Sequence, residues 1–462
     1  MSITIQSPFD NSVVGTVKKL TQDEANTALA KAYELSRDKS KALPHYERIA
    51  ILERLATLVS QESKEFALLI AKEGGKPLID AKVEVNRAID GIRLAIKEMM
   101  HGLAGEEIPM GYTKASENRL AFTTREPIGV VLAISAFNHP LNLIVHQVVP
   151  AIAVGCPVIV KPASSTALTC EKFVNLVHKA GLDKALCVFA PCSIDVAEFL
   201  VSDSRISFFS FIGSAKVGWY LRNKLYPGTR YALEHGGVAP VIVDKNIDNM
   251  DEVVASIVKG AYYHAGQVCI STKRVYIHED IIIEMSKKIT AAVSKLNVGD
   301  PTLPETEVGP LITEKEASRV ESWVNEAIAE GAKLLVGGKR ISTTLFEPTL
   351  LLEPSKKSKV SVEETFGPVL CLYAYKDMDD ALTWANSLDM PFQSAIFSNN
   401  INVITKAYKE FEAAAVIVND HTAFRVDWMP FAGRRSAGYG IGGIGHAMKE
   451  MTNHKMIVIK TK

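Results

Sequence analysis

The sequence has little of what membrane and secreted proteins need. No uninterrupted apolar run approaches the roughly 18 residues of a membrane-spanning helix. The longest candidate, near residues 141–155, is broken by polar residues and a proline. The first residues contain neither the basic segment nor the apolar stretch of a secretory signal. We therefore expect no membrane association and a cytoplasmic location.

A charge excess of either sign is also absent. Lys and Arg together number 52, and Asp and Glu together number 52. A neutral chain offers no general attraction for nucleic acid or for an anionic membrane surface, so neither is expected as a partner. A length of 462 residues is too great for one ordinary core and favours two or three domains.

Cysteines are few and scattered. There are six, with no C-x-x-C pair and no H-E-x-x-H motif. In a chain of this size the pattern indicates reduced thiols rather than a disulfide framework, and no metal site is expected. Five of the six are expected to be small buried side chains: Cys156, Cys170, Cys187, Cys192 and Cys371.

Helical and strand patterns alternate along most of the chain. Residues 21–102 show the three- and four-residue apolar spacing of helices. From about residue 128, short β-rich runs alternate with helical segments, and a second alternating stretch begins after Gly237. This alternation predicts an α/β protein with parallel sheets covered on both faces.

Three side chains form a candidate reaction centre. Cys269 stands in Gly-Gln-Val-Cys-Ile-Ser, Glu234 precedes a Gly-Gly pair, and Asn138 lies in a loop that ends at Pro140. They offer a thiol nucleophile, a carboxylate base and an amide donor for an oxyanion. We expect the cysteine loop to enter a helix whose amide dipoles lower the thiol pKa. Taken singly, each could be an inert cysteine, a solvated acid or a turn asparagine.

In order and spacing these residues resemble the aldehyde dehydrogenase superfamily, from about residue 5 to the C-terminus. The resemblance implies a Rossmann-type parallel-sheet cofactor domain, an α/β catalytic domain and a small β oligomerisation flap, and therefore a homodimer or homotetramer. The implied ranges are 1–105 and 128–236 for the cofactor domain, 237–453 for the catalytic domain, and 106–127 with 454–462 for the flap. An unpaired apolar strand at the C-terminus would be a liability that a partner could cover.

Three further motifs resemble the family's cofactor site, for NAD or NADP. They are Lys-Pro-Ala-Ser at 161–164, Phe-Ile-Gly-Ser at 211–214 and Glu-Glu-Thr-Phe at 363–366. Ser164 permits NADP, because it would not repel a 2′-phosphate as the family's alternative Glu does. The implied cofactor-binding residues are Lys161 and Ser164 for the adenosine ribose, Gly213 and Ser214 for the pyrophosphate, Glu364 for the nicotinamide ribose and Phe366 beside the ring.

The implied chemistry is aldehyde oxidation through a covalent intermediate. Cys269 adds to the aldehyde, Asn138 and the Cys269 backbone N–H hold the oxyanion, and hydride leaves to the cofactor. Glu234 then directs water at the thioester. Retention of this Glu argues against a relative that transfers the acyl group to coenzyme A. His235 replaces the usual Leu of the family's Glu-Leu-Gly-Gly motif.

Arg87 and Arg425 resemble arginines that grip an acidic substrate tail in the branch acting on phosphonoacetaldehyde and glyceraldehyde 3-phosphate. Guanidinium groups suit phosphonate, sulfonate or carboxylate. Val268 stands where that branch often has a third Arg, which favours a less charged tail such as that of sulfoacetaldehyde. His139 could supply a further donor.

Other interpretations stay open. Arg87 could pair with Glu84 on the same helix, and Arg425 with Asp427. The substrate could instead be lactaldehyde or another hydroxyaldehyde. The chain could also be a non-catalytic NAD(P)-binding protein on the same fold, which the complete set of three reaction-centre residues disfavours.

Overall fold

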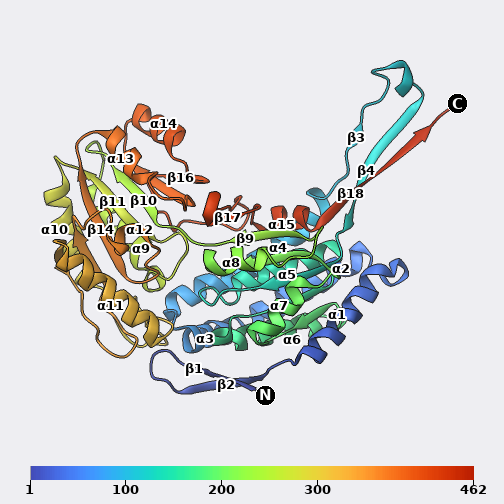
Figure 1. Cartoon of the computed structure of the whole chain (residues 1–462), viewed down its shortest axis with the longest axis horizontal. Helices are drawn as coiled ribbons and strands as arrows, with labels where there is room; N and C mark the ends of the chain where they lie inside the picture. The colour runs from blue at the N-terminus through green and yellow to red at the C-terminus, as the bar shows by residue number, and fades with distance from the viewer. Residues whose placement is uncertain (1) are drawn as a thin grey trace.

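Two sheets covered by helices, and a small antiparallel sheet that projects from the body, make up the molecule (Figure 1). The computed structural model describes residues 2–462. A short N-terminal hairpin of β1 (Ser2–Gln6) and β2 (Val13–Lys18) precedes the first helices. The expected α/β class is confirmed.

Four helices occupy the region predicted to be helical. They are α1 (Gln22–Arg37), α2 (His45–Gln61), α3 (Ser63–Gly74) and α4 (Leu78–His101). Apolar side chains of α2 at three- and four-residue spacing, among them Leu52, Leu55 and Val59, are fully buried. Their burial against the neighbouring helices is the main source of helix stability here, since isolated helices of this length are marginal in water.

The first sheet has the order β17-β9-β8-β5-β6-β7. Its central strands are parallel, so their carboxyl ends meet at one edge, where open α/β sheets bind ligands. The strands are β5 (Val130–Ile134), β6 (Val158–Lys161), β7 (Cys187–Phe189), β8 (Ile206–Ile212) and β9 (Arg230–Glu234). The intervening helices are α5 (Asn142–Val154), α6 (Ala167–Lys179), α7 (Ile194–Ser202) and α8 (Ala215–Arg222).

The second sheet has the order β12-β13-β14-β11-β10-β15-β16 and is parallel except for β12. Its strands are β10 (Ala239–Val243), β11 (Thr272–His278), β12 (Lys333–Val336), β13 (Thr349–Leu352), β14 (Val369–Tyr375), β15 (Gln393–Phe397) and β16 (Ala415–Val418). Its helices include α9 (Met250–Tyr262), α10 (Ile282–Val293), α11 (Glu314–Ala329), α13 (Met378–Ala385) and α14 (Ile401–Glu410). The sequence pattern did not single out β13, β15, α11, α13 or α14.

The chain returns to the first sheet near its end. Strand β17 (Gly438–Tyr439) pairs with β9, and α15 (Ile444–Glu450) packs on α4 and α5. Ile444 and Met448 belong to the same hydrophobic core as the first helices. This segment lies within residues 237–453, which the sequence had grouped with the second sheet. The difference arises because the apolar face of a seven-residue helix does not show in the sequence which core it joins.

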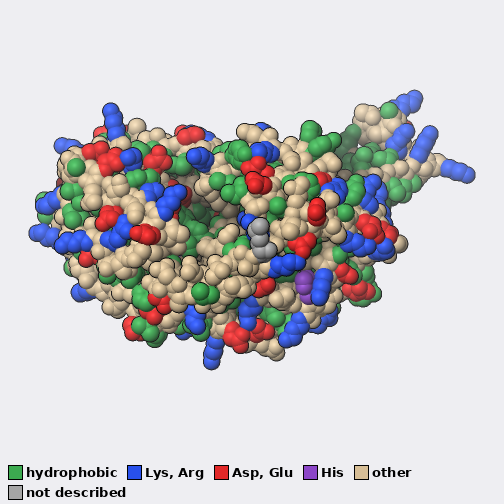
Figure 2. All heavy atoms as spheres, turned by 60° about the horizontal axis from the view of Figure 1, so that its bottom comes forward, with side chains coloured by type: hydrophobic (Ala, Val, Ile, Leu, Met, Phe, Trp, Pro, Cys, Tyr) green, Lys and Arg blue, Asp and Glu red, His purple; other side chains and the backbone are tan. Residues whose placement is uncertain are grey.

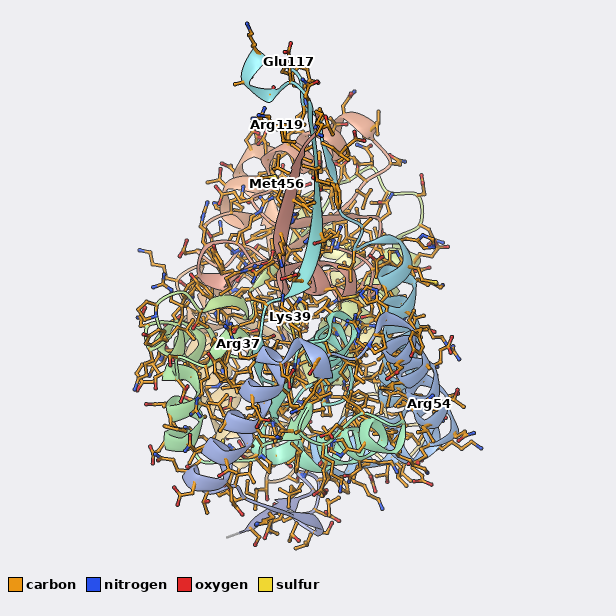
Figure 3. All side chains as sticks on the ribbon, turned by 90° about the vertical axis from the view of Figure 1, so that its right-hand side faces the viewer. Arg37, Lys39, Arg54, Glu117, Arg119 and Met456 are labelled. Carbon is orange, nitrogen blue, oxygen red and sulfur yellow. The ribbon has the colours of Figure 1, made fainter. Side chains whose placement is uncertain are left out.

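Strand β18 (Thr452–Lys460) pairs antiparallel with β4 (Arg119–Pro127), which also pairs with β3 (Glu107–Ile108). The terminal strand is therefore not alone, because the segment near residues 106–127 pairs with it over its whole length. Together they form an arm that extends from the body, with Glu117 near its tip and Met456 along β18 (Figures 1 and 3). We refer to β3, β4 and β18 as the arm.

The surface mixes charges of both signs. Lys and Arg side chains alternate with Asp and Glu over the face shown in Figure 2. Among residues 2–462 there is no helix that is both long and apolar enough to cross a membrane. Within the same residues no group of three or more His, Cys, Asp or Glu side chains is arranged to hold a metal ion.

Gly75 ends α3 in the left-handed region, with φ of 69°, and a Cβ there would lie 2.8 Å from Pro310 Cγ and 2.9 Å from Pro8 Cγ. We expect Gly75→Ala to lower the free energy of unfolding by about 1–2 kcal/mol through backbone strain and by about 1–3 kcal/mol more through overpacking. Gly331→Ala is the matched control, because Gly331 has φ of 105° and open space around it. Thermal unfolding of both variants tests this, and equal losses would contradict the packing argument.

Candidate active site

A cavity of about 920 Å³ lies where the carboxyl ends of the first sheet face the second sheet. It is lined by residues of both halves of the molecule. Of the residues expected from the sequence to act in catalysis or substrate binding, all six line it: Asn138, Glu234, Cys269, Arg87, Arg425 and His139. Of the expected cofactor residues, four line it: Gly213, Ser214, Glu364 and Phe366.

Cys269 lies in a turn between a 3₁₀ segment (Tyr263–Gly266) and β11. Its side chain is partly exposed, and its carbonyl accepts a hydrogen bond from the Gly237 N–H at 3.2 Å. The expectation of a helix that begins at this cysteine is wrong, because the chain after it continues as a strand. The thiol pKa is raised rather than lowered, first by burial and then by the negative charge of Glu234.

Three consecutive left-handed residues precede the nucleophile. His264, Ala265 and Gly266 have φ of 47°, 52° and 67°. For a residue with a Cβ this conformation costs about 1–2 kcal/mol. Such strain persists only where surrounding contacts hold it, and it concentrates at functional sites.

Asn138 and Glu234 approach the cysteine loop from the first sheet. The Asn138 Nδ2 donates to the carbonyl of Gln267, two residues before the cysteine, at 3.0 Å. This contact holds the amide beside the Cys269 turn, which is the position that the predicted role as an oxyanion donor requires. Glu234 is the last residue of β9, and burial raises the pKa of its carboxyl above the ordinary value. A raised pKa brings a carboxylate closer to the range suited to a general base.

Asp427 organises the basic side chains at one part of the cavity. It accepts two hydrogen bonds from the Arg87 guanidinium, from Nη2 at 2.7 Å and from Nε at 3.1 Å. His146 Nε2 lies 2.7 Å from the same carboxylate. The pKa of Asp427 is held well below its usual value by these partners. The suggested Arg87–Glu84 pair is wrong, because Glu84 pairs with the buried Lys76 instead.

Arg425 is placed differently from Arg87. Its guanidinium carbon lies 3.4 Å from the centre of the Phe431 ring. Its Nε has no hydrogen-bond partner among residues 2–462. The suggested Arg425–Asp427 ion pair does not form, since Arg87 occupies that carboxylate. Arg425 is therefore a cation available to a ligand in the cavity.

His139 is buried beside Tyr263, with 3.3 Å between its Nε2 and the Tyr263 hydroxyl. Burial and the surrounding cations hold the pKa of His139 well below its usual value. The imidazole is therefore neutral near pH 7 and can form hydrogen bonds without adding charge to the cavity.

The Gly213–Ser214 turn stands between β8 and the N-terminus of α8. A backbone turn at a helix N-terminus suits a diphosphate, because its N–H groups and dipole favour an anion. Glu364 has a buried carboxylate oxygen without a hydrogen-bond partner in the described chain, available to a ribose hydroxyl. Phe366 packs edge-to-face on Phe137 with ring centres 5.8 Å apart. These features fit a nicotinamide dinucleotide.

Lys161 and Ser164 are at the next strand end and do not line the cavity, although Ala163 between them does. Lys161 is the last residue of β6, and its Nζ lies 3.3 Å from the Pro162 carbonyl. Ser164 is exposed at the start of a short 3₁₀ turn. Both lie at the carboxyl end of β6, and their assignment to the cofactor stays a prediction.

His235, which replaces the leucine of the family motif, joins the ends of β8 and β9 through hydrogen bonds. Its Nδ1–H donates to the Gly213 carbonyl at 2.9 Å, and the Gly213 N–H donates to the Glu234 carbonyl at 3.0 Å. The ring occupies the space over Gly218, where a Cβ would lie 2.0 Å from its Cε1. Gly218 is therefore required beneath this histidine, and His235 holds the Gly213–Ser214 turn in place.

Lys273 is a site residue that the sequence did not reveal. This buried side chain of β11 donates to the Gly266 carbonyl at 3.0 Å and to the Gly367 carbonyl at 2.7 Å. It links the turn before the nucleophile to the loop that carries Glu364. Burial lowers the pKa of Lys273 to about 7. A lysine in a strand has no sequence signal for this role, which depends on two loops distant in sequence.

Comparison with known proteins agrees with this geometry. The model of the aldehyde dehydrogenase family matches residues 1–457. The chain belongs to the aldehyde dehydrogenase family. The expectation from the sequence motifs is thereby confirmed for the family and for the fold.

Individual relatives of this aldehyde dehydrogenase cover nearly its whole length. It is 37% identical to a 3-sulfolactaldehyde dehydrogenase of Priestia aryabhattai over 98% of this chain and 94% of the relative. Its structure is similar to aldehyde dehydrogenase 21 of Physcomitrella patens in complex with the reaction product succinate, with a TM-score of 0.96, 34% identity and coverage of 100% and 95%. Glyceraldehyde-3-phosphate dehydrogenase GapN of Methanocaldococcus jannaschii, complexed with NADP, has a TM-score of 0.94, 35% identity and coverage of 99% of both chains.

The influence of Glu234 on the thiol can be measured without a substrate. Removing a neighbouring negative charge lowers a thiol pKa, so Glu234→Gln should speed alkylation of Cys269 by iodoacetamide at pH 8 by about three- to tenfold. Mass spectrometry of the labelled peptide reports the rate. Glu316→Gln is the control, because this second acid also lines the cavity and its carboxylate pairs with Arg319. Equal rates in the parent and Glu234→Gln would contradict the electrostatic coupling.

Proposed function

We propose that this aldehyde dehydrogenase oxidises a small aldehyde with a singly charged anionic tail to the carboxylate, using NAD or NADP. The proposal rests on a difference between two arginines in one cavity, only one of which is paired with a carboxylate. Arg87 is neutralised by Asp427, whereas Arg425 keeps an unpartnered Nε.

The charges of the cavity favour one negative charge over two. Arg87 and Arg425 are positive, Asp427 is negative, and His139 and His146 are neutral because burial lowers their pKa values. These five side chains together carry a single positive charge, and Glu234, which also lines the cavity, acts on the Arg425 guanidinium and offsets part of that charge. A sulfonate or a carboxylate would balance it, while a doubly charged phosphonate or phosphate would leave a negative charge beside Asp427.

Two relatives support this tail chemistry. One acts on 3-sulfolactaldehyde, whose tail is a sulfonate, and the other holds succinate, whose tail is a carboxylate. A sulfoacetaldehyde-type substrate agrees with both. A phosphonoacetaldehyde-type substrate is the less favoured member of the same class, and lactaldehyde lacks the anionic tail altogether.

The residues of the site account for each step. Cys269 adds to the carbonyl carbon, while the Asn138 amide donates to the oxygen that becomes negative. Nicotinamide supplies the hydride acceptor when it is bound. Glu234 then takes a proton from the water that attacks the thioester, and the carboxylate product leaves. Burial and the negative charge of Glu234 raise the pKa of the thiol, so its proton passes to solvent as the sulfur attacks.

We assign cofactor binding to residues 1–105 and 128–236, and catalysis to 237–453 without the returning segment near residues 438–451. Ser164 leaves room for a 2′-phosphate, and the similar GapN structure contains NADP, so both cofactors are expected to bind. The cavity residues Gly213, Ser214, Glu364 and Phe366 are assigned to this dinucleotide.

The arm supports a proposal about assembly. Four consecutive residues of β18 expose large apolar side chains, with Met456 57% exposed, and β4 adds Leu120 and Phe122. Figure 1 shows that this arm projects from the body. An exposed apolar sheet is a liability unless another surface covers it, so we assign the arm to contact between copies in a homodimer or homotetramer. A cytoplasmic location is proposed on the reduced cysteines.

The charged tail is tested by steady-state kinetics at pH 8. The parent should prefer sulfoacetaldehyde to phosphonoacetaldehyde, lactaldehyde and propanal in kcat/KM. Arg425→Ala should lower kcat/KM for sulfoacetaldehyde by about 10- to 100-fold, the loss typical of a hydrogen bond to a charged group, and change propanal by less than about threefold. Arg435→Ala is the control, since Arg435 is a surface arginine paired with Glu412.

Two outcomes would contradict this assignment. An equal fall in kcat/KM for propanal and sulfoacetaldehyde in Arg425→Ala would show that Arg425 acts on the reaction and not on the tail. A parent enzyme that prefers lactaldehyde would favour the hydroxyaldehyde alternative.

The role of Glu234 is tested by separating the two halves of the reaction. Glu234→Gln should keep a burst of reduced cofactor but lower the steady-state rate by about 10²–10⁴-fold, because only thioester hydrolysis needs the base. The base works when ionised and its pKa is raised above 4.5, so the parent kcat should fall as the pH drops through that raised pKa. A normal steady state in Glu234→Gln would remove this residue as the base.

A further inference from the structure

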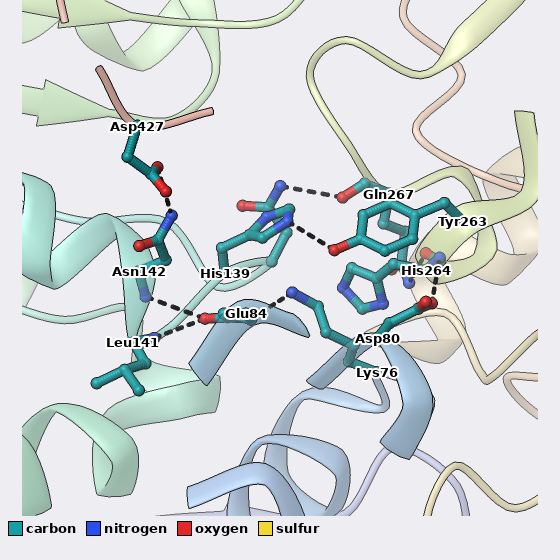
Figure 4. A network of polar contacts seen from close by, with 11 residues as sticks. Lys76, Asp80, Glu84, His139, Leu141, Asn142, Tyr263, His264, Gln267 and Asp427 are labelled. Atoms are coloured by element: carbon teal, nitrogen blue, oxygen red, sulfur yellow. Dashed lines mark hydrogen bonds and ion pairs between the residues drawn. The ribbon is translucent and has the colours of Figure 1, made fainter. Parts of the chain in front are cut away.

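Two acidic residues of α4, Asp80 and Glu84, point at two different loops of the active site (Figure 4). They are one helical turn apart, so their side chains lie on the same face of the helix. Neither residue lines the cavity itself. Each accepts hydrogen bonds from the backbone of a loop that brings a reaction-centre residue into the cavity.

Asp80 faces the nucleophile loop. Its Oδ2 accepts a hydrogen bond from the His264 backbone N–H at 3.1 Å. His264 is the first of the three left-handed residues that lead into the Cys269 turn. Because that backbone conformation is unfavourable for residues with a Cβ, a contact at its first residue helps to determine where the rest of the loop runs.

Glu84 faces the oxyanion loop. Its Oε1 accepts hydrogen bonds from the Leu141 N–H at 2.8 Å and the Asn142 N–H at 3.1 Å, just after the loop that carries Asn138. Its other oxygen pairs with Lys76. The two loops meet where the Asn138 Nδ2 donates to the Gln267 carbonyl. The first turns of α4 thus contact both sides of the oxyanion site.

We propose that Asp80 is a positioning residue, which holds the His264–Gly266 turn so that Cys269 and the Asn138 amide act on the same carbonyl. Glu84 provides the matching support on the other side. The role goes beyond the proposed substrate preference and does not depend on the substrate tail.

The burial of the Asp80 carboxyl supports a structural role for its hydrogen bond to the His264 N–H. Burial raises the pKa of its carboxyl to about 6, so the group has been taken partly out of water to reach this N–H. The acceptor oxygen is what the turn needs, rather than the charge. An asparagine at the same position can accept the same hydrogen bond through its amide oxygen.

The experiment compares four variants of the full chain. Asp80→Ala removes the acceptor, Asp80→Asn keeps it, and Asp80→Ser keeps a polar side chain that is too short to reach the turn. Val85→Ala is the control, since Val85 is a buried apolar residue of the same helix and its truncation destabilises the fold without removing a hydrogen bond to either loop.

Two rates are measured for each variant with saturating cofactor. The first is the burst of reduced cofactor with propanal, which needs the thiol and the oxyanion donor aligned. The second is alkylation of Cys269 by iodoacetamide, which needs the thiol but no oxyanion donor. Misplacement of about 1 Å at a reaction centre can cost roughly 10²-fold in rate.

We expect Asp80→Ala and Asp80→Ser to lower the burst rate by about 10- to 100-fold while alkylation changes by less than about threefold. Asp80→Asn should restore the burst to within about threefold of the parent, and Val85→Ala should lower the melting temperature with the burst retained. A retained burst in Asp80→Ala or Asp80→Ser would overturn the proposal. A fall in the burst rate of Asp80→Asn or Val85→Ala as large as that in Asp80→Ala would also overturn it.

If Asp80→Ala does not fold, Asp80→Ser and Asp80→Asn still decide the question. Failure of the substrate proposal would look different. It would appear as a changed preference among aldehydes in the parent enzyme, with the propanal burst and its response to Asp80 unaffected.

Discussion

The hydrogen bond from the Asn138 amide to the Gln267 carbonyl is the contact on which the site depends. Asn138 follows a strand of the first sheet, and Gln267 precedes a strand of the second sheet. The two sheets are folded by separate hydrophobic cores, so their relative placement must be determined where their loops meet. This contact and the Asp80–His264 contact beside it place the Asn138 amide against the Cys269 turn.

Burial of ionisable groups away from water determines the direction of most pKa shifts in the cavity. Burial raises the pKa values of the Cys269 thiol and the Glu234 carboxyl and lowers that of His139. Each shift disfavours the charged form of the group in the resting site. The exceptions are the groups with partners, such as Asp427 with Arg87, which stay ionised because hydrogen bonds replace the lost water. The site therefore keeps few free charges, and Arg425 is prominent among them.

Backbone strain and buried polar contacts occur together around the nucleophile. The turn from His264 to Gly266 is left-handed at every residue. Asp80 contacts its first N–H and Lys273 contacts its last carbonyl, so side chains from α4 and β11 hold both ends. Strain of this kind persists because the surroundings specify it more strongly than the local sequence does.

The sequence by itself determined the helices of residues 21–102, most alternating elements of the first sheet, part of those of the second sheet, and the chemical identity of Cys269, Glu234 and Asn138. Apolar periodicity and motif order are local properties, so they can be recognised without the fold. Only the tertiary structure decided that no helix follows Cys269, that Arg87 rather than Arg425 pairs with Asp427, and that residues 438–451 rejoin the first core. Those outcomes depend on which residues, hundreds of positions apart, share one buried space, and neither spacing nor composition contains that information.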